Sequence, residues 1–275
     1  MFDLIKLALD EDKVFNDITT KEFLSQDLTI KAVLISNTSG ILCGINNFIE
    51  IFTMVDKNCR FELYSHECSK INKGTTILKI IGSSMILSVE RIALNILQYM
   101  SGIATLTNTF VNIVHNKKMK IYDTRKIIPG YRNLAKYAVR CGGGINHRMN
   151  LSDMILIKDN HLKFIDDLKT RINEFRLKYK NVLIEIECEN YQQVMQSLYS
   201  RADIIMLDNM TQEQMKTMIN IIRTNSTTTY KPEIEISGGI NLETAKKMAH
   251  LDVDRVSIGM ITQPSCIMDF TLEII

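Results

Sequence analysis

The sequence predicts an α/β protein in two parts. Before residue 105, short strand-like segments and a helix follow one another in the irregular order of an α+β domain. After residue 118, short apolar runs alternate with helical segments at the spacing of β/α units. This second part fits a barrel or a doubly wound sheet. No G-x-G-x-x-G follows its first strand, which weakens the dinucleotide-binding version of the sheet.

In the first part, the apolar spacing predicts a helix over residues 3–10, and Asp17 is placed to cap a following turn. A helix runs through Phe48 and Phe52. The longest helical pattern covers residues 88–115, where we expect Ser88 to cap a first helix and Ser101-Gly102 to separate it from a second. The predicted strands are 30–36, 60–64 and 77–81.

In the second part, six apolar runs of strand length are each followed by a polar segment. The predicted strands are 119–122, 154–157, 182–186, 203–207, 233–236 and 255–258, and the predicted helices are 162–179, 190–199, 211–223 and 241–249.

The composition limits the function classes. The 275 residues are 45% hydrophobic, which is ordinary for a chain that buries a core. The net charge of +2, from 33 basic and 31 acidic residues, argues against a general nucleic-acid or membrane-surface protein, so any cationic site is local. No signal-peptide layout or membrane-spanning apolar run is present, and the six cysteines have no zinc spacing. We therefore expect a soluble cytoplasmic protein with reduced cysteines.

Chemistry-bearing residues follow every predicted strand of the second part. In β/α barrels the carboxyl ends of the strands face the active site. Cations come first in the chain, acids follow and glycines come last. The cations are Arg125, Lys126, His147, Arg148, Lys158 and His161. So many positive groups at the ends of buried strands predict a ligand with several negative charges.

The acids and glycines extend this site. Glu187 and Asp208 end successive strands, where hard oxygens suit Mg²⁺ or sugar hydroxyls; an ion pair with Lys158 or Arg148 is compatible with both. Ser237, Gly238 and Gly239 precede a helix, and Gly259 follows the next strand. A lone Gly-Gly is more often an ordinary tight turn, but the pair with Gly259 favours a phosphate-binding cradle.

These motifs together resemble the quinolinate phosphoribosyltransferase family, over nearly the whole chain. The residues that carry the resemblance are Glu90-Arg91-Ile92-Ala93-Leu94-Asn95, Ser101-Gly102-Ile103-Ala104-Thr105, Asp123-Thr124-Arg125-Lys126, Pro129-Gly130, Lys136-Tyr137-Ala138-Val139-Arg140-Cys141-Gly142-Gly143-Gly144, Asn146-His147-Arg148, Lys158-Asp159-Asn160-His161, Glu185-Ile186-Glu187, Met206-Leu207-Asp208-Asn209 and Ser237-Gly238-Gly239-Ile240. The combination is specific, whereas no single piece would be. Ile127 and Ile128 depart from the family, which usually has Thr after Asp-Thr-Arg-Lys, and this puts fine substrate positioning in question.

The resemblance implies an N-terminal α/β sandwich domain, residues 1–105, to which residues 266–275 return, and an open α/β barrel of about seven strands, residues 106–265. It also implies a homodimer in which Arg91 reaches into the partner's site. The implied reaction transfers phosphoribose from phosphoribosyl pyrophosphate to quinolinate with loss of CO₂, in NAD synthesis.

Each site residue receives a role from the same resemblance. Quinolinate is bound by Arg91, Arg125, His147, Arg148 and Lys158. Phosphoribosyl pyrophosphate is bound by Lys126, His161, Glu187, Asp208, Ser237, Gly238, Gly239 and Gly259. Glu187 and Asp208 hold Mg²⁺, and the catalytic groups are Lys126, Lys158, Glu187 and Asp208.

Three alternatives remain beside this one. The first is the molybdenum-transport-associated branch of the family, which tends to lack the lysine found here as Lys158. The second is a Schiff-base aldolase that uses Lys158, and the third is a non-catalytic sensor of phosphoribosyl ligands.

Overall fold

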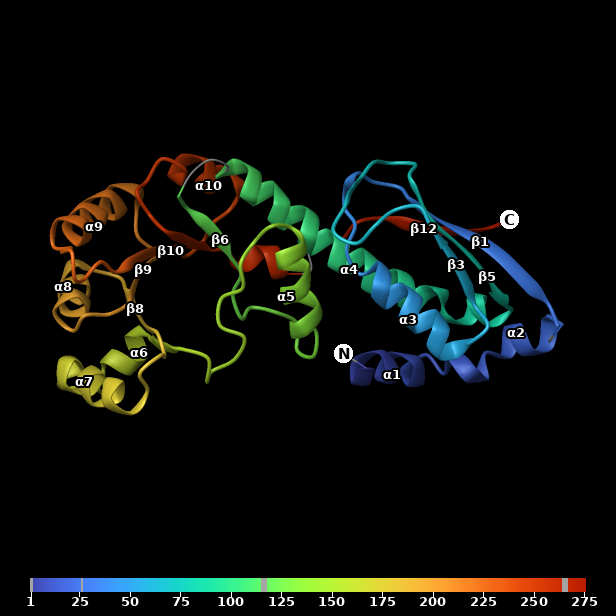
Figure 1. The fold of residues 1–275 in the computed structure, drawn as a ribbon, viewed down its shortest axis with the longest axis horizontal. Coiled ribbons are helices and arrows are strands. Elements are labelled where there is room, and N and C mark those ends of the chain that lie inside the picture. The colour runs from blue at the N-terminus through green and yellow to red at the C-terminus, as the bar shows by residue number, and fades with distance from the viewer. Residues whose placement is uncertain (1, 26, 115–117, 264–266) are drawn as a thin grey trace. The chain divides into compact units, whose positions relative to one another are not determined.

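The structure is a computed structural model that describes residues 2–25, 27–114, 118–263 and 267–275. The chain divides into two compact units, whose elements are labelled in Figure 1. The first contains residues 1–109, 127–143 and 261–275, and the second contains residues 110–126 and 144–260. Residues 127–143, which follow the predicted boundary at 105, thus belong to the first unit. The predicted boundary at 265 and 266, Cys266 and the predicted helix end at His115 lie outside the described residues.

An antiparallel sheet with the strand order β12–β1–β5–β3 forms the core of the first unit. Strand β1 alternates between exposed and buried residues, with Ile30, Ala32 and Leu34 buried, as expected for a sheet with one face in the core. The strands are β1 (Thr29–Ser36), β3 (Arg60–Leu63), β5 (Thr76–Ser83) and β12 (Phe270–Ile274), and a separate ribbon joins β2 (Gly40–Ile41) to β4 (Lys70–Ile71). Strand β12 had no counterpart among the predicted strands, yet it pairs with β1 along its whole length.

The helices that begin in the first unit are α1 (Phe2–Glu11), η1 (Val14–Asn16), α2 (Ile18–Phe23), α3 (Ile45–Val55), α4 (Met85–Ile113) and α5 (Arg132–Cys141). The predicted cap at Asp17 is confirmed, because its carboxylate accepts the Thr19 and Thr20 backbone N–H groups at the start of α2. Ser88 is not a cap: α4 begins at Met85, and the Ser88 hydroxyl donates to Asp17 instead.

The predicted break in the long helix at Ser101-Gly102 is wrong, because α4 continues through both residues. Both are buried. The Ser101 hydroxyl accepts the Cys43 N–H at 2.9 Å and contacts the Cys43 carbonyl at 3.0 Å. Small residues here let a neighbouring backbone approach the helix closely, so they serve packing and do not end the helix.

The second unit is built on a parallel sheet with the order β6–β11–β10–β9–β8–β7. Its strands are β6 (Lys120–Tyr122), β7 (Ile155–Ile157), β8 (Ile184–Cys188), β9 (Ile204–Asp208), β10 (Glu233–Ser237) and β11 (Arg255–Ser257). An isolated parallel bridge between Tyr122 and Ile145 adds a seventh segment beside β6. The predicted fold class, an open α/β barrel of about seven strands with an N-terminal sheet domain, is confirmed.

Helices connect these strands. They are α6 (Asp159–Leu162), α7 (Leu168–Lys178), α8 (Tyr191–Tyr199), α9 (Gln212–Thr224) and α10 (Leu242–Met248), and η2 (Gly259–Thr262) follows β11. The helix predicted over 162–179 begins six residues later, at Leu168, because the Asp167 carboxylate accepts the Thr170 N–H and starts α7 there. Helix α5 has no counterpart among the predicted helices.

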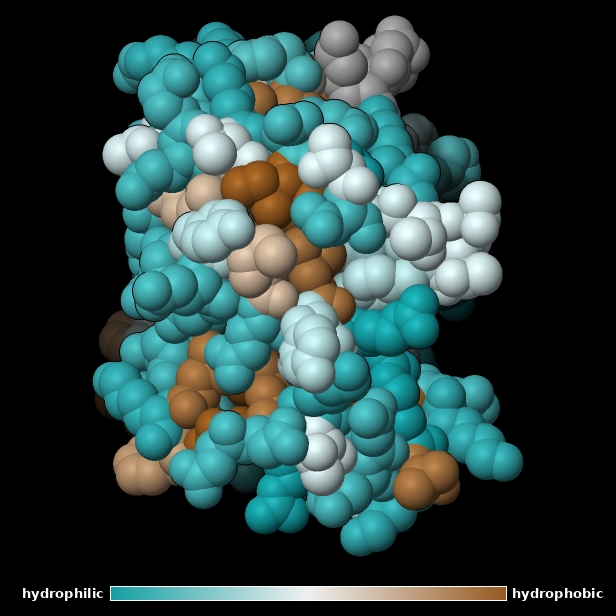
Figure 2. All heavy atoms as spheres, turned by 90° about the vertical axis from the view of Figure 1, so that its left-hand side faces the viewer, coloured by the Kyte–Doolittle hydropathy of each residue, from teal (hydrophilic) through white to brown (hydrophobic). Residues whose placement is uncertain are grey.

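The outer face of the second unit is mostly hydrophilic, and apolar residues show only in small patches between polar ones (Figure 2). This matches helices such as α9, which buries Met215, Met218 and Ile222 and turns its polar side outward. No helix among the described residues is long and apolar enough to span a bilayer.

One cysteine pair differs from the reduced cysteines expected from the sequence. Cys68 and Cys141, 73 residues apart, form a disulfide in the first unit. Cys43, Cys59 and Cys188 are free thiols. A separation of this length carries no sequence signal for pairing, because it depends on the tertiary fold.

Candidate active site

A cavity of about 300 Å³ lies at the carboxyl ends of the strands of the second unit. Five of the six predicted cations line it: Arg125, Lys126, His147, Arg148 and Lys158. The predicted acids Glu187 and Asp208 and the predicted Ser237 line the same space. The remaining lining residues are Asp123, Thr124, Leu156, Met206 and Ser257. The structure therefore brings the positive and negative groups predicted from separate strand ends into one cavity.

The loop that carries His147 and Arg148 is fixed to the end of β6 by Asp123. This aspartate is fully buried. Its Oδ1 accepts the His147 backbone N–H at 2.8 Å, and its Oδ2 accepts the Asn146 side-chain amide at 2.7 Å. A buried carboxylate is costly without such partners. Asp123 thus orients the loop from a position on the cavity wall.

His147 is the link between the cavity and a buried acidic pair. Its Nδ1 accepts the Arg148 N–H at 2.9 Å, and its Nε2 lies 3.0 Å from Glu185 Oε2 and 3.4 Å from Glu235 Oε1. Both glutamates are fully buried. Since both ring nitrogens face protein groups, the geometry favours a positioning role for His147 over the predicted contact with a substrate carboxylate.

Glu185 and His147 have shifted pKa values. Burial, followed by the charge of Glu235, raises the pKa of Glu185 to about 7. Burial lowers the pKa of His147, but Glu185 and Glu235 outweigh it and raise that pKa to about 9. Glu185 and His147 therefore each hold a proton more strongly than they would in water. Burial and then the charge of Arg125 lower the pKa of Arg148, which shows that the two guanidinium groups repel each other across the cavity.

Nearer the solvent, Lys158 and Glu187 form an ion pair. The Lys158 Nζ lies 3.1 Å from Glu187 Oε2, and the lysine side chain is 47% exposed while the glutamate is 11% exposed. This is one of the ion pairs that the sequence left open as compatible with either role of the acids. An ammonium group held in this pair is accessible to an anion entering from solvent.

Asp208 and Ser237 line the cavity, and Asn209 lies beside Asp208. Asp208 and Ser237 are register partners on β9 and β10, and the Asp208 Oδ2 accepts the Asn209 side-chain amide at 2.6 Å. Gly238 has a φ of +92°, and a Cβ there would lie 2.3 Å from the Asn209 Oδ1. The close approach of the two chain segments therefore requires glycine at position 238.

Gly259 lies beside Lys126. A Cβ at Gly259 would be 3.1 Å from the Lys126 Cδ, so the missing side chain leaves room for the lysine stem. Gly238, Gly239 and Gly259 do not themselves line the cavity. Their predicted role in binding a phosphate stays a prediction.

Two predicted cations are placed elsewhere. His161 is not among the lining residues of this cavity; its Nδ1 accepts the Lys158 backbone N–H at 3.1 Å and helps start α6. Arg91 is exposed on α4 in the first unit. The departures Ile127 and Ile128 also do not line the cavity.

A larger cavity of about 550 Å³ lies along β7, α6 and α7. It shares Arg148 and Leu156 with the first, and His161 lines it. Its other walls are mainly apolar, including Leu151, Phe164 and Phe175. Despite its size, it lacks the facing acids and lysines that polar chemistry requires.

Some residues of the site had not been predicted as part of it. Glu185 and Glu235 could have been found from the alternation Glu185-Ile186-Glu187 and Glu233-Ile234-Glu235, which places a second acid inside each strand. Ser257 is buried, lines the cavity, and its hydroxyl makes no hydrogen bond to any described residue. An unsatisfied hydroxyl facing a cavity is suited to a ligand.

The predicted magnesium ligands fit the ion in chemistry. Glu187 and Asp208 both present carboxylates to the cavity. Mg²⁺ is usually held by one or two carboxylates together with substrate phosphates, and a complete protein cage is not needed. The lysines on the same walls leave room for those phosphates to supply the other ligands.

Comparison with known proteins was made for the sequence and for the structure. The description "Quinolinate phosphoribosyl transferase, N-terminal domain" matches residues 17–101, and its C-terminal counterpart matches residues 103–273. A "Probable nicotinate-nucleotide pyrophosphorylase [carboxylating]" from Methanocaldococcus jannaschii is 37% identical over 99% of this chain and 96% of its own length. The Mycobacterium leprae "Nicotinate-nucleotide pyrophosphorylase [carboxylating]" is 31% identical, over 99% of this chain and 96% of its own.

Solved structures agree. The NadC crystal structure from Streptococcus pyogenes has a TM-score of 0.90 and 35% identity, covering 98% of this chain and 94% of that one. The nicotinate-nucleotide pyrophosphorylase from Ehrlichia chaffeensis has a TM-score of 0.92 and 34% identity, covering 100% and 98%. With both domain descriptions matched in order and whole-length relatives above 30% identity, the chain belongs to the quinolinate phosphoribosyl transferase family.

Proposed function

We propose that the cavity at the strand ends of the second unit is where quinolinate reacts with phosphoribosyl pyrophosphate. As a member of its family, the chain is a phosphoribosyltransferase of NAD biosynthesis, which transfers phosphoribose to quinolinate with decarboxylation. The observation that supports the location best is the convergence of Arg125, Lys126, Arg148 and Lys158 with Glu187 and Asp208 on one cavity. Both substrates are polyanions, and the charges match them.

The cations divide between the two substrates. Arg125 and Arg148 present guanidinium groups, which bind carboxylates in a bidentate manner. Lys126 and Lys158 present compact charges suited to phosphate oxygens. His147 supports this set through the Arg148 backbone. We therefore assign quinolinate to the arginines and the pyrophosphate group to the lysines, with Lys158 able to reach either substrate.

The reaction needs negative groups near the ribose and positive groups near the departing pyrophosphate. The ring nitrogen of quinolinate attacks as pyrophosphate leaves, and positive charge develops on the ribose. Glu187 and Asp208 offset that charge, and Lys126 and Lys158 offset the charge on the departing pyrophosphate. The pyridinium that forms withdraws electrons, so the carboxylate next to the ring nitrogen leaves as CO₂ and the electron pair left on the ring carbon takes a proton from water. Among the cavity-lining residues Thr124, Ser237 and Ser257 have hydroxyls, but none is hydrogen-bonded to a base, so a covalent nucleophile is not required.

Mg²⁺ belongs to this proposal. Glu187 and Asp208 would hold the ion, which would neutralise pyrophosphate charge when bound. Ser237, Gly238, Gly239 and Gly259 would take the 5′-phosphate, because turns and helix starts present backbone N–H groups to anions.

The purified protein should convert quinolinate and phosphoribosyl pyrophosphate, with Mg²⁺, into nicotinate mononucleotide, CO₂ and pyrophosphate. Nicotinic acid should react poorly, because it lacks the second carboxylate that the paired arginines would hold. Chromatography of the nucleotide product, together with trapped ¹⁴CO₂, measures both outcomes. Efficient use of nicotinic acid would contradict the proposed recognition.

We also propose that the active form is a cytoplasmic homodimer in which Arg91 completes the partner's site. Its support is that Arg91 is a solvent-exposed cation in a family motif, outside the residues that line the cavity of its own chain. Inactive Arg91→Ala and Arg125→Ala proteins, unfolded and refolded together, should regain roughly a quarter of wild-type activity, because half of the dimers are then hybrids with one intact site. Each variant refolded alone is the control, and no recovery in the mixture would refute the shared site.

A further inference from the structure

The first unit contains a disulfide that the transferase chemistry does not use. Cys68 precedes β4, and Cys141 is the last residue of α5. Their Cα atoms are 5.0 Å apart, although the residues are separated by 73 positions in the chain. The bond joins two surface segments, since Cys68 is exposed and Cys141 is half-exposed.

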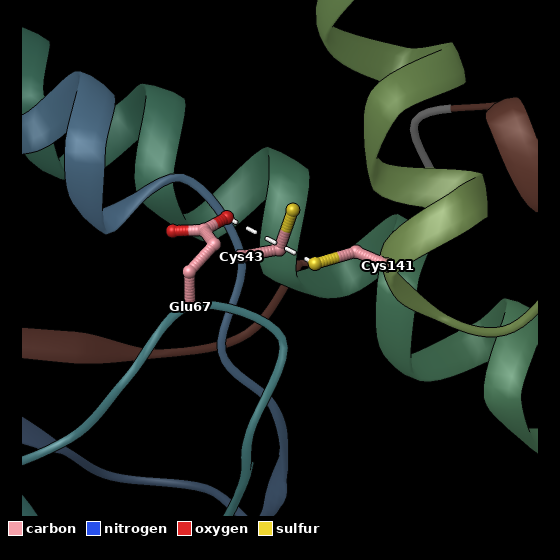
Figure 3. A group of neighbouring side chains, drawn as sticks. All are labelled: Cys43, Glu67 and Cys141. Atoms are coloured by element: carbon pink, nitrogen blue, oxygen red, sulfur yellow. Dashed lines mark hydrogen bonds between the residues drawn. The ribbon is translucent and has the colours of Figure 1, made fainter.

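A third cysteine lies within reach of this bond. The Cys43 Sγ, the Cys141 Sγ and a Glu67 carboxylate oxygen all lie within 4.8 Å of one another (Figure 3). Cys43 is fully buried and is a free thiol. Cys141 therefore has two possible partners, Cys68 on the solvent side and Cys43 on the interior side.

We propose that these three cysteines form a thiol–disulfide site, in which Cys68 and Cys141 are the pair that opens and closes while Cys43 stays a thiol. The class of reagent that opens it is a dithiol reductant, and a small disulfide closes it. The choice of partner for Cys141 is set by Glu67 and by access from solvent.

Glu67 keeps Cys43 out of the exchange. Its carboxylate oxygens accept the Gly44 and Ile45 N–H groups at 2.7 and 3.0 Å, so the negative charge is fixed at the start of α3, directly beside Cys43. Burial, and after it the charge of Glu67, raise the pKa of the Cys43 thiol. Because only the thiolate attacks a disulfide, a thiol held protonated does not displace Cys68.

Access explains why Cys68 is the sulfur that is attacked. A thiolate of the dithiol bonds to the exposed Cys68 sulfur, the bond from Cys68 to Cys141 breaks, and Cys141 leaves and takes a proton. The second sulfur of the dithiol then displaces Cys68 as a thiol and closes the reagent into a disulfide. In the open form the Cys141 S–H can donate to Glu67 Oε1, which already lies 3.9 Å from the sulfur.

Opening the bond should loosen the end of α5. The disulfide encloses a long loop, and such crosslinks strongly reduce the conformational entropy of the unfolded chain. We expect the midpoint of thermal unfolding to fall by roughly 10 °C on reduction. The measurement compares protein with and without dithiothreitol, and Cys68→Ser protein should show the low midpoint in both conditions.

The partner assignment is tested by thiol mapping. The full chain is equilibrated in glutathione buffers of graded ratio, acid-quenched, denatured, labelled with N-ethylmaleimide and digested without reductant. Mass spectrometry should show the labels on Cys68 and Cys141 appearing together in one transition, and a Cys68–Cys141 peptide at the oxidised end. Labels on both residues at every ratio, or a Cys43–Cys141 peptide, would overturn the proposal.

Variants separate the roles of the cysteines. Cys43→Ser should keep the transition, and Cys59→Ser, the matched change at a free thiol outside the cluster, should keep it as well. In Cys68→Ser protein, Cys141 should take the label at every ratio; a crosslink from Cys141 to Cys43 there would refute the role given to Glu67. Stoichiometric protection of all three thiols by Zn²⁺ in the reduced protein would replace the redox site with a metal site. None of these readouts uses transferase activity, so their failure leaves the proposed function standing.

Discussion

The charged groups at the mouth of the cavity are partly exposed, whereas those at its floor are buried. At the mouth, Lys158 and Glu187 form a partly exposed ion pair that solvent and ligand can reach. At the floor, His147, Glu185 and Glu235 are buried and face one another. Exposed pairs are worth little to stability, whereas buried ones are costly to break. The charged groups at the mouth are therefore open to a ligand, whereas those at the floor fix one another in place.

Removing a mouth charge should have the largest effect. In Lys158→Ala protein, kcat/KM should fall by about 30- to 4,000-fold, because losing one partner of a desolvated charge contact costs about 2–5 kcal/mol. Initial rates at several phosphoribosyl pyrophosphate concentrations measure it.

Lys163→Ala is the matched control for this change. Lys163 lies on the surface five residues further on, 3.9 Å from Asp159, and its loss should leave kcat/KM within a factor of two. Similar losses of kcat/KM in both variants would show that Lys158 has no particular role in binding substrate.

The buried groups of the floor should make the free energy of unfolding depend on pH. Glu185 has a folded pKa raised from 4.5 to about 7, so the native state binds more protons than the unfolded state between those values, and stability falls as pH rises through them. The raised pKa of His147 continues this fall from pH 6.5 to about 9. Glu185→Gln should remove a loss on the order of 2 kcal/mol, measured by urea unfolding from pH 5 to pH 9.

A surface acid gives the reference for that experiment. Glu213 on α9 is 83% exposed, and Glu213→Gln should keep the wild-type slope. If the Glu185→Gln profile also runs parallel to that of the wild type, the floor does not hold the extra proton.

Ser257 should show the smallest effect, because it is buried like the floor but its hydroxyl makes neither a hydrogen bond nor an ion pair with any described residue. If its hydroxyl contacts substrate, Ser257→Ala should raise one KM by about 2- to 12-fold, the equivalent of about 0.5–1.5 kcal/mol. Stability should stay within about 0.5 kcal/mol. Ser200, whose hydroxyl is also buried and unpartnered but lies outside the cavity, provides the control; equal KM values in Ser257→Ala and wild type would assign Ser257 to packing.

The strands and the cavity were predictable for one physical reason. Parallel strands put their carboxyl ends at one edge, so Arg125, Lys158, Glu187 and Asp208 could be brought together from order alone. His161 was not predictable in this way, because its ring turns back to the Lys158 backbone when α6 begins. Tertiary packing also decided Ser101 and Gly102, which were predicted to break the helix but lie inside α4, where the Ser101 hydroxyl contacts the Cys43 backbone.

The disulfide and the buried acids were missed for a different reason. Pairing of Cys68 with Cys141 depends on how α5 returns to the first unit, which local sequence does not encode. Glu185 and Glu235 lie inside strands whose apolar neighbours predict only burial. Their meeting with His147 depends on the loop that Asp123 fixes.

Asp123 has a consequence for anyone who wishes to change what this enzyme accepts. Because one carboxylate accepts hydrogen bonds from both the Asn146 amide and the His147 backbone, the segment that leads to Arg148 is fixed to the end of β6. Libraries that randomise Arg125 or Arg148 can therefore test other carboxylic acids as substrates while the backbone of this loop stays in place. In libraries that also vary Asp123, most members would lack the hydrogen bonds that hold this loop. They would be inactive, so their selectivity could not be measured.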